Sequence, residues 1–399
     1  MKILILSSKI PFPPKDGGSI ATLGIAKGLE KAGNEVTMLS LNTRKHYVSP
    51  EEIPSPAYIN MKIIPVFHDT SINVFKALSN LLFSDEPYNG IRFISPAFEQ
   101  ELISLLKTEK FDIIQLEGPY MGYYISAIRK YSKTLISLRA HNVEHEIWER
   151  KSQGEKNPIR RFYLNLLTRR IKEHETRIIK TVDFLVPISE RDEKILLAMF
   201  PNIPSRVIPA GVDVENYPQP EDPQYPSLFF IGSLDWLPNQ EGLLWFIDHV
   251  WPELHKNQKI QFHVGGRGAP YWLEKKLITN NIHFHGEIED AYKFMNQYAI
   301  MISPVFSGSG IRIKNLEAMM MGKAVVSTSM GSEGVSYTHN ENILLADDPQ
   351  TFISIIKEYA TDRIKYDKIA KSGRAFVMES FNNLAFCKNL AEFYRNNLK

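Results

Sequence analysis

Apolar runs of strand length alternate with helical patterns through the first half of the chain. The first run, residues 2–8, is followed by a loop rich in Pro and Gly and then by a helical pattern that starts at Ser19, the expected N-cap, and stops at Gly33. Five more apolar runs follow, at residues 34–42, 59–67, 111–118, 133–142 and 182–189. Apolar strands interleaved with helices indicate a parallel sheet covered on both faces.

The same alternation starts again after residues 201–227, a segment dense in Pro and polar residues that is typical of a linker. Six further apolar runs lie at residues 227–234, 259–266, 282–287, 299–306, 323–329 and 342–347, and the pattern from residue 350 onward is helical. The chain is therefore predicted to be an α/β protein with two doubly wound sheets. Its 399 residues are also more than one hydrophobic core usually serves.

Composition and charge narrow the class of protein. Hydrophobic residues at 43% and charged residues at 23% are typical of a globular chain. A formal charge of +2 gives no overall attraction to nucleic acid, so we expect no nucleic-acid partner. A single cysteine, Cys387, excludes an internal disulfide framework and favours a reducing compartment, most simply the cytoplasm. The first ten residues are expected to form a strand rather than a secretion signal, and no apolar stretch approaches the ~18 residues of a membrane span.

Ligands of doubly wound sheets bind at the carboxyl ends of the strands, so functional groups are expected just after the apolar runs. The strongest candidate is the Ser-Gly-Ser-Gly loop at residues 307–310, which follows the run at 299–306 and precedes a helix that opens near Ile311. Glycines let the backbone approach a ligand closely, and the N–H groups at the start of a helix suit a phosphate. We therefore expect a phosphate-binding loop.

Two cations and a carboxylate follow in the same helix. Arg312 and Lys314 lie in its first turn, where positive charge opposes the helix dipole unless an anion is bound. Glu317 lies one turn deeper, where it could accept a hydrogen bond from a sugar hydroxyl. The alternative is a glycine-rich tight turn whose Arg and Lys side chains are simply solvated.

Residues 308–328, GSGIRIKNLEAMMMGKAVVST, resemble the donor-binding signature of glycosyltransferase family 4, which has the GT-B architecture. In that family two glutamates eight positions apart flank a Gly-rich helix start, followed by Ala-Met, a Gly and a Val-Val strand. Other stretches match the family in the same order, over about residues 2–395. They are Gly17-Gly18 after the first strand, VPISE at 186–190, IPAGVD at 208–213, FFIGSLDWLPNQEG at 229–242, HVGGRG at 263–268 and HGEIED at 285–290.

The resemblance implies two Rossmann-like domains that face each other across a cleft. A domain of about residues 1–205 would bind the acceptor, and a domain of about 206–380 would bind a nucleotide-sugar, either a UDP- or a GDP-sugar. The last helix, about 381–399, would pack back on the first domain. The resemblance also implies transfer with retention of the anomeric configuration and without an obligatory metal or other cofactor.

Site residues follow from the same resemblance, position by position. The expected catalytic residues are His141, Arg312 and Lys314. The expected donor-binding residues are Gly17, Gly18, Gly232, Ser233, Gly265, Ile288, Gly308, Ser309, Gly310, Ile311 and Glu317, and the expected acceptor-side residues are Asn142, Glu144 and Ser189.

The chain departs from the family pattern around the donor phosphates. Ser309 stands where the first glutamate of the signature is expected, whereas Glu317 keeps the second, which in the family usually holds the ribose. The Arg and Lys usual after the first strand of the donor domain are replaced by Ser233 and by Asn239 or Gln240. Arg312 and Lys314 are therefore expected to neutralise the leaving diphosphate, with Arg267 as the next candidate.

Three other patterns have competing interpretations. His141 and His145 could suggest a metal site, but no Cys or third His lies nearby in the sequence. Two interpretations of His141 remain: a residue beside the transferred sugar, or a structural histidine. Gly17-Gly18 lacks the spacing of a dinucleotide-binding fingerprint. Residues 157–180 carry many basic residues among apolar ones, so this helix could contact an anionic membrane at its inner face or could pack on the sheet with a solvated basic face.

The sequence thus predicts a retaining hexosyltransferase that acts on a glycan or lipid-linked acceptor in cell-surface polysaccharide synthesis. Two rival interpretations have the same fold. One is an enzyme that epimerises or hydrolyses a nucleotide-sugar, and the other is a non-catalytic partner that binds a glycan or a nucleotide.

Overall fold

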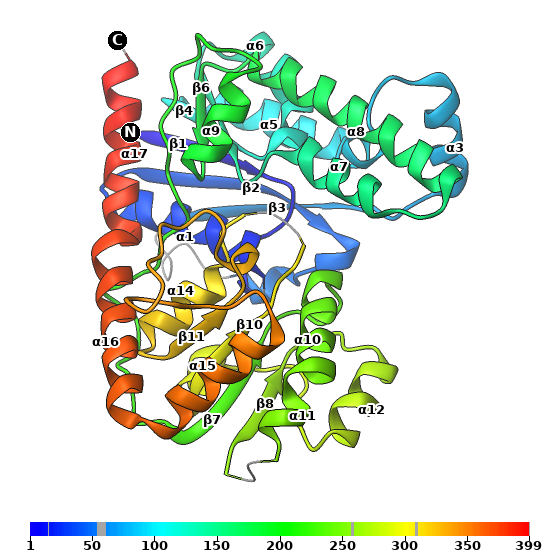
Figure 1. Cartoon of the computed structure of the whole chain (residues 1–399). Helices are drawn as coiled ribbons and strands as arrows, with labels where there is room; N and C mark the ends of the chain where they lie inside the picture. The colour runs from blue at the N-terminus through cyan, green and yellow to red at the C-terminus, as the bar shows by residue number, and fades with distance from the viewer. Residues whose placement is uncertain (15, 54–60, 257–258, 308–309, 399) are drawn as a thin grey trace. The chain divides into compact units, whose positions relative to one another are not determined.

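The computed structural model describes residues 1–14, 16–53, 61–256, 259–307 and 310–398 (Figure 1). The chain divides into two units. Unit 1 comprises Met1–Ala210 together with Asn383–Lys399, and unit 2 comprises Gly211–Asn382. The C-terminal segment therefore belongs to the same unit as the N-terminal one. Among the described residues, we find no helix long and apolar enough to cross a membrane.

Unit 1 is built on a parallel sheet of six strands in the order β3-β2-β1-β4-β5-β6. The strands are β1 (Lys2–Ser7), β2 (Glu35–Thr43), β3 (Lys62–His68), β4 (Ile113–Glu117), β5 (Leu135–Ala140) and β6 (Phe184–Pro187). Its helices are α1 (Gly17–Lys31), α3 (Val74–Phe83), α4 (Tyr88–Ile91), α5 (Pro96–Thr108), α6 (Ile125–Tyr131), α7 (Glu144–Gly154), α8 (Pro158–Ile179), α9 (Glu190–Leu197) and α17 (Asn383–Asn397).

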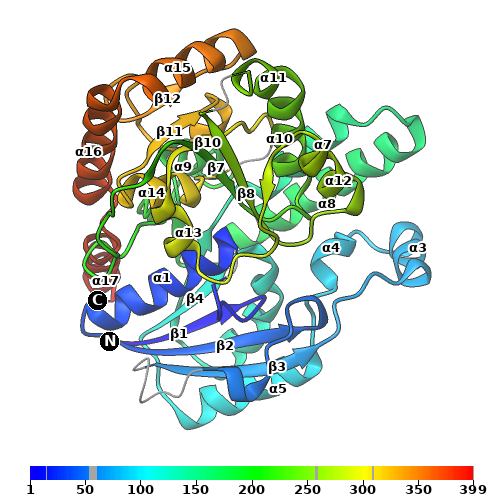
Figure 2. The ribbon, with the colours of Figure 1, turned by 90° about the horizontal axis from the view of Figure 1, so that it is seen from below.

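Both faces of this sheet are buried, which explains the unbroken apolar strands. Side chains of a strand alternate between its two faces. On β1, Ile3 and Ile5 join a cluster with α1 and α17, whereas Leu4 and Leu6 join a cluster with α5, α6 and α8. Figure 2 shows α1 and α17 on one side of strands β1 to β3 and α5 on the other.

Helices α1 and α17 approach closely where α1 has a glycine. A Cβ atom on Gly28 would lie 2.3 Å from Cys387 Sγ, so only a residue without a side chain fits there. Asn383 donates a hydrogen bond of 2.7 Å to the carbonyl oxygen of Gly24. These contacts attach the last helix to the first one.

Unit 2 repeats the plan with the strand order β12-β11-β10-β7-β8-β9, again parallel. The strands are β7 (Gln224–Ile231), β8 (Gln261–Gly265), β9 (His283–Phe284), β10 (Tyr298–Ser303), β11 (Ala324–Ser327) and β12 (Leu344–Leu345). The helices are α10 (Leu237–His249), α11 (Trp251–Leu254), α12 (Tyr271–Thr279), α13 (Ala291–Gln297), α14 (Ile313–Met320), α15 (Pro349–Thr361) and α16 (Arg363–Ser380).

The twelve predicted apolar runs coincide with the twelve strands named here, which confirms the predicted fold class of two doubly wound sheets. The predicted N-cap of the first helix was wrong by three residues. Asp16, not Ser19, is the N-cap of α1, because its carboxylate accepts the N–H of Ser19 at 2.9 Å. Gly17 and Gly18 are therefore the first residues of the helix itself.

Candidate functional site

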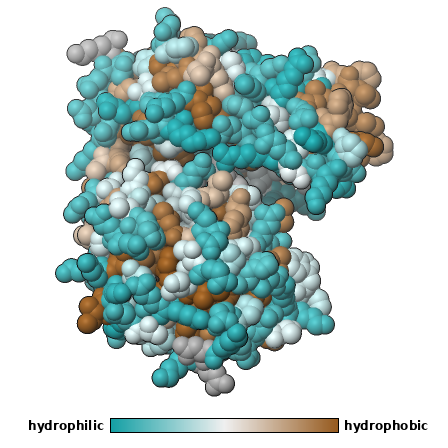
Figure 3. Space-filling view, viewed as in Figure 1, coloured by the Kyte–Doolittle hydropathy of each residue, from teal (hydrophilic) through white to brown (hydrophobic). Residues whose placement is uncertain are grey.

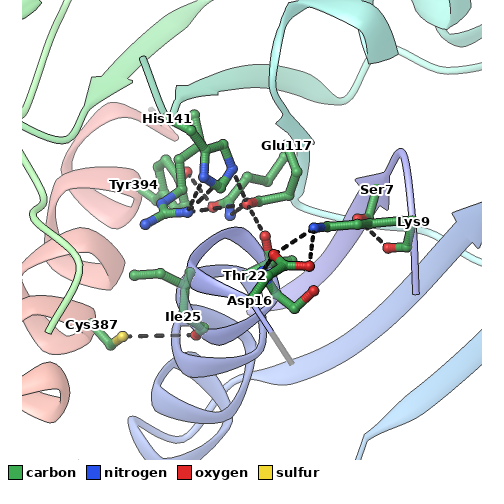
Figure 4. Close-up of polar contacts among 12 residues, drawn as sticks. Ser7, Lys9, Asp16, Thr22, Ile25, Glu117, His141, Cys387 and Tyr394 are labelled. Carbon is green, nitrogen blue, oxygen red and sulfur yellow. Dashed lines mark hydrogen bonds and ion pairs between the residues drawn. The ribbon is translucent and has the colours of Figure 1, made fainter. Parts of the chain in front are cut away.

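The carboxyl ends of β4 and β5 bring together a carboxylate and an imidazole in unit 1. Glu117 is the last residue of β4, and His141 follows the last residue of β5. A Glu117 carboxylate oxygen, Oε2, lies 2.6 Å from His141 Nε2 (Figure 4). His141 is half-buried, whereas Glu117 is buried. The strand-end position predicted for His141 is thus the place where the structure puts it.

Glu117 is held by further donors. Arg139 Nη1 lies 3.1 Å and Thr22 Oγ1 3.0 Å from the same Oε2 atom. Gln115 Nε2 donates to the other oxygen at 2.5 Å, and Tyr394 of α17 in turn donates to Gln115 Oε1 at 2.8 Å. A hydrogen-bonded chain therefore runs from the last helix of the protein to the candidate catalytic histidine.

This network keeps Glu117 ionised. Burial disfavours the carboxylate, but the interactions with Arg139, His141 and Gln115 outweigh it and lower the pKa of Glu117 to about 2. An ionised carboxylate only accepts hydrogen bonds, so His141 donates through Nε2. The imidazole is consequently held in one tautomer, with its proton on Nε2 and with Nδ1 as the acceptor, 3.5 Å from Arg139 Nη1.

The start of α1 lies beside this cluster in Figure 4. Lys9 Nζ lies 2.6 Å from an oxygen of Asp16, the N-cap residue. No atom lies within 4 Å of a Cβ placed on Gly17, so the described structure leaves open space at this turn. A Cβ on Gly18 would lie 3.3 Å from Asp16 Oδ1. The predicted residues Gly17 and Gly18 thus belong to unit 1, as His141 does.

The acceptor-side predictions fall on three separate features of unit 1. Asn142 lies half-buried between β5 and α7. Glu144 is the first residue of α7, and burial followed by the neighbouring Glu175 charge raises the pKa of its carboxyl to about 7. Ser189 is the N-cap of α9 and accepts the N–H of Asp192, so its hydroxyl has a structural partner.

In unit 2, the loops after β7, β8 and β9 are bridged. Gly232 donates its N–H to Gly265 O at 3.1 Å, and Arg267 Nε donates to Ser233 Oγ at 3.1 Å. A Cβ on Gly265 would lie 2.5 Å from Ile288 Cγ1, so this glycine allows the loop before α13 to pack against the end of β8. The structure thus brings together four predicted donor-site residues, Gly232, Ser233, Gly265 and Ile288. Arg267, the next candidate for neutralising the diphosphate, lies with them.

Lys314 reaches this group from α14. Its Nζ donates to Asn239 Oδ1 at 3.1 Å and lies 4.3 Å from the centroid of the Phe230 ring. A Cβ on Gly232 would be 3.4 Å from the same Nζ, so the ammonium stands directly beside the end of β7. Burial, followed by the charge of Arg312, lowers the pKa of Lys314 to about 7.

Arg312 is the N-cap residue of α14 and is buried. Its guanidinium donates to Gly310 O at 3.1 Å and to Ser307 O at 3.3 Å, and it lies 5.6 Å from the centroid of the Trp236 ring. The side chain therefore braces the predicted phosphate loop as well as adding charge to it. Its assignment to the leaving group stays a prediction.

Glu317 lies on α14 next to an aromatic pair. Tyr217 and Tyr292 pack edge to face with ring centroids 4.8 Å apart. Burial raises the pKa of Glu317 to about 7, and the nearby Tyr217 hydroxyl opposes this shift. A carboxyl in this environment can accept or donate a hydrogen bond near neutral pH, as expected of a group that contacts a sugar hydroxyl.

The remaining donor-site predictions concern the loop itself. Gly308 and Ser309 lie outside the described residues. Gly310 has a φ of +84°, which favours glycine, and Ile311 lies next to Gly334, on which a Cβ would be 3.2 Å from Ile311 Cγ1.

The structure separates the two histidines that suggested a metal site. His141 contacts Glu117, whereas His145 Nδ1 lies 2.7 Å from Glu175 Oε2. Within the described ranges, no group of three or more His, Cys, Asp or Glu side chains is arranged to hold a metal ion.

Sequence reasoning missed Glu117, Arg139 and Tyr394. The first two are charged residues inside apolar runs. A charged residue in a strand that is predicted to be buried indicates that an oppositely charged or hydrogen-bonding partner is buried beside it. Tyr394 had no such signal, because its hydroxyl meets Gln115 only when α17 packs on unit 1.

Two family models match the chain. The model described as Glycosyltransferase Family 4 matches residues 15–216, and the model described as Glycosyl transferases group 1 matches residues 225–362. A relative described as an uncharacterized 44.6 kDa protein in the cps region of Klebsiella pneumoniae is 23% identical over 393 residues, 96% of this chain and 97% of the relative.

Solved structures resemble the whole chain. Sucrose-phosphate synthase from Thermosynechococcus elongatus matches with a TM-score of 0.71 and 16% identity, over 99% of each chain. HepE from Anabaena, in complex with UDP and glucose, matches with a TM-score of 0.69 and 15% identity, over 99% of this chain and 100% of HepE. Together with the two six-stranded sheets, these likenesses confirm the predicted GT-B fold.

Proposed function

Because the chain belongs to Glycosyltransferase Family 4, we propose that it transfers a hexosyl unit from a UDP-sugar to a glycan or lipid-linked acceptor with retention of configuration. The Anabaena neighbour in complex with UDP and glucose supports the choice of UDP over GDP. The Klebsiella relative from a cps region supports a place in cell-surface polysaccharide synthesis.

One observation carries this proposal. The carboxyl end of β7 in unit 2 is flanked by two cationic side chains, Lys314 and Arg267. Within the described residues, they donate hydrogen bonds to the neutral side chains of Asn239 and Ser233. Burying an ammonium group without a carboxylate is unfavourable, and the lowered pKa of Lys314 reports this. A diphosphate at this edge would supply the missing negative charge, at the place where doubly wound sheets bind nucleotides.

The chemistry follows from charge development. As the bond between the anomeric carbon and the phosphate oxygen breaks, negative charge grows on the diphosphate, and preorganised cations stabilise it more in the transition state than in the ground state. The acceptor oxygen bonds to the anomeric carbon on the face from which the diphosphate departs. Its proton passes to an oxygen of the leaving diphosphate, so no protein base is required.

His141 has a different part in this proposal. Its Nε2–H is engaged by Glu117, so Nδ1, which lies 3.5 Å from Arg139 Nη1, is the ring nitrogen that would accept from a hydroxyl of the transferred sugar or of the acceptor. Glu117 acts through His141 as a positioning residue.

The test is a screen of UDP-, GDP- and dTDP-hexoses with the purified chain, followed by analysis of the sugar product with and without acceptor. Transfer from a UDP-hexose that depends on acceptor, with the anomeric configuration kept, is expected. A new free sugar or an epimer formed without acceptor would instead support the hydrolase or epimerase. Lys314→Met should abolish most of the transfer, while Lys275→Met, at an exposed position on α12, is the matched control.

A further inference from the structure

Helix α3 exposes the residues that a helix normally buries. Seven of its ten residues are apolar, yet Asn80 is the one residue of the helix that is buried. Phe75 is 85% and Phe83 84% exposed, and Val74, Leu78 and Leu82 are exposed as well. Amphipathic helices of water-soluble domains direct such residues into the core. Within the described structure, the apolar face of α3 is therefore open to a partner.

The first turn of α8 adds to this apolar surface. Ile159 is 80% and Phe162 73% exposed, whereas Leu164, Leu167 and Ile171 further along the helix are buried. The alternative in which this helix packs an apolar stripe on the sheet therefore fits its last turn, where Ile178 and Ile179 join the core cluster of the sheet, and not its start. We define the α3–α8 surface as the exposed apolar side chains of Ile72, Val74, Phe75, Leu78, Leu82, Phe83, Ile159 and Phe162.

These two segments project from the same end of unit 1. Figure 1 and Figure 2 show α3 and the turn between α7 and α8 protruding on the same side, and Figure 3 shows a cluster of apolar atoms over α3 there. Arg170 of α8 fixes the two helices together, because its guanidinium donates to Asn80 O at 3.3 Å and to Leu81 O at 3.1 Å. These bonds hold α3 against the middle of α8, about two turns after Phe162.

Basic side chains accompany the apolar ones. Lys76 on α3, Lys156 before α8 and Arg160 and Arg161 in its first turn are all exposed. Nearby carboxylates are fewer or engaged: Asp85 is exposed, Glu155 accepts the N–H of Asn157, and Glu86 pairs with Arg177. Protruding aromatic and aliphatic residues with a basic rim match an anionic lipid surface, where the rings enter the headgroup layer and the cations meet lipid phosphates.

We propose that unit 1 docks on an anionic membrane surface through the α3–α8 surface. The inference adds a membrane to the partners of the enzyme and suits a lipid-linked acceptor, but it concerns binding alone. It is tested without sugar transfer, so it and the proposed function can fail separately.

The experiment is co-sedimentation of the full chain with vesicles. Phosphatidylcholine vesicles with about 30 mol% phosphatidylglycerol should bind it, and pure phosphatidylcholine or high salt should weaken binding. The double variant Phe75→Ser/Phe83→Ser should bind at least about tenfold more weakly, because two apolar anchors are lost. Arg160→Glu/Arg161→Glu should remove most of the dependence on anionic lipid.

Matched controls exist in unit 2. Ile364→Ser changes a side chain that is 82% exposed, and Lys368→Glu/Lys371→Glu reverses two exposed charges; both should bind as the unchanged protein does. Thermal unfolding of each variant checks that it folds. Absence of binding to anionic vesicles, or equal binding by Phe75→Ser/Phe83→Ser and the controls, would overturn the proposal. A dimer in light scattering that Phe75→Ser/Phe83→Ser dissociates would also overturn it and assign the surface to a second copy of the chain.

Discussion

Binding of UDP is expected to draw a proton onto Lys314. In the free protein, burial and the charge of Arg312 lower the pKa of Lys314 to about 7. A diphosphate beside Nζ stabilises the charged form and so raises the pKa in the complex. Only about a tenth of the free protein carries a charged Lys314 at pH 8, so about 0.9 proton should be taken up per UDP bound at that pH.

The dependence on pH has a definite sign. A group that gains a proton on binding strengthens binding as the pH falls. Affinity for UDP should therefore decrease by up to about tenfold per unit as the pH rises above 7, and should level off below 7, where free Lys314 is already charged. The terminal phosphate stays ionised above pH 7, because a phosphate monoester has its second pKa at about 6, so the decrease of affinity above pH 7 reports Lys314 alone.

Isothermal titration calorimetry in buffers of different ionisation enthalpy measures the proton uptake directly. The control is Lys314→Arg, whose guanidinium stays charged at pH 8, so that its binding should take up almost no proton and vary little with pH. Lys275→Arg should behave like the unchanged protein. Equal proton uptake at pH 8 by the unchanged protein and Lys314→Arg would refute the assignment of Lys314 to the phosphate site.

Five other outcomes are expected. His141→Ala should lower turnover by roughly 100-fold or more while affinity for UDP changes little; steady-state kinetics with calorimetry decides, and a loss confined to UDP binding would contradict it. Glu117→Gln should lower turnover about 10- to 100-fold through the orientation of His141, an effect that vanishes in the His141→Ala background. Arg312→Ala should lower turnover on the order of 100- to 1000-fold, and Arg312→Lys should recover part of the lost turnover. Transfer should also continue in EDTA, and activity that is lost in EDTA and restored by Mg²⁺ would count against a metal-free mechanism. Gly28→Leu should destabilise unit 1 by about 1–3 kcal/mol in a denaturant titration, because its side chain meets Cys387, and an unchanged midpoint would argue against the close approach of α1 and α17.

Local pattern was enough to predict the strands. A strand that is buried on both faces is apolar at most positions, so runs such as those of β1, β10 and β11 stand out from the helices and loops around them. The strand pattern put His141 after β5 and the helical pattern put Lys314 in α14, as observed, whereas their roles at a ligand site stay predictions. The first residue of helix α1 was harder to predict, because Ser and Asp are both good N-cap residues. Asp16 is the observed N-cap, and it also forms an ion pair with Lys9.

The partners of these residues depend on tertiary structure. Glu117 and His141 are 24 positions apart and meet because β4 and β5 are neighbours in the sheet, and Tyr394 joins them from the far end of the chain. The low pKa of Lys314 has the same origin, since burial and the nearness of Arg312 are properties of the packed chain. Composition alone likewise gives no reason to separate α3 from a core helix. Hydrophobic periodicity is a local property that residue order carries by itself, whereas contacts, burial and exposure depend on which distant segments pack together.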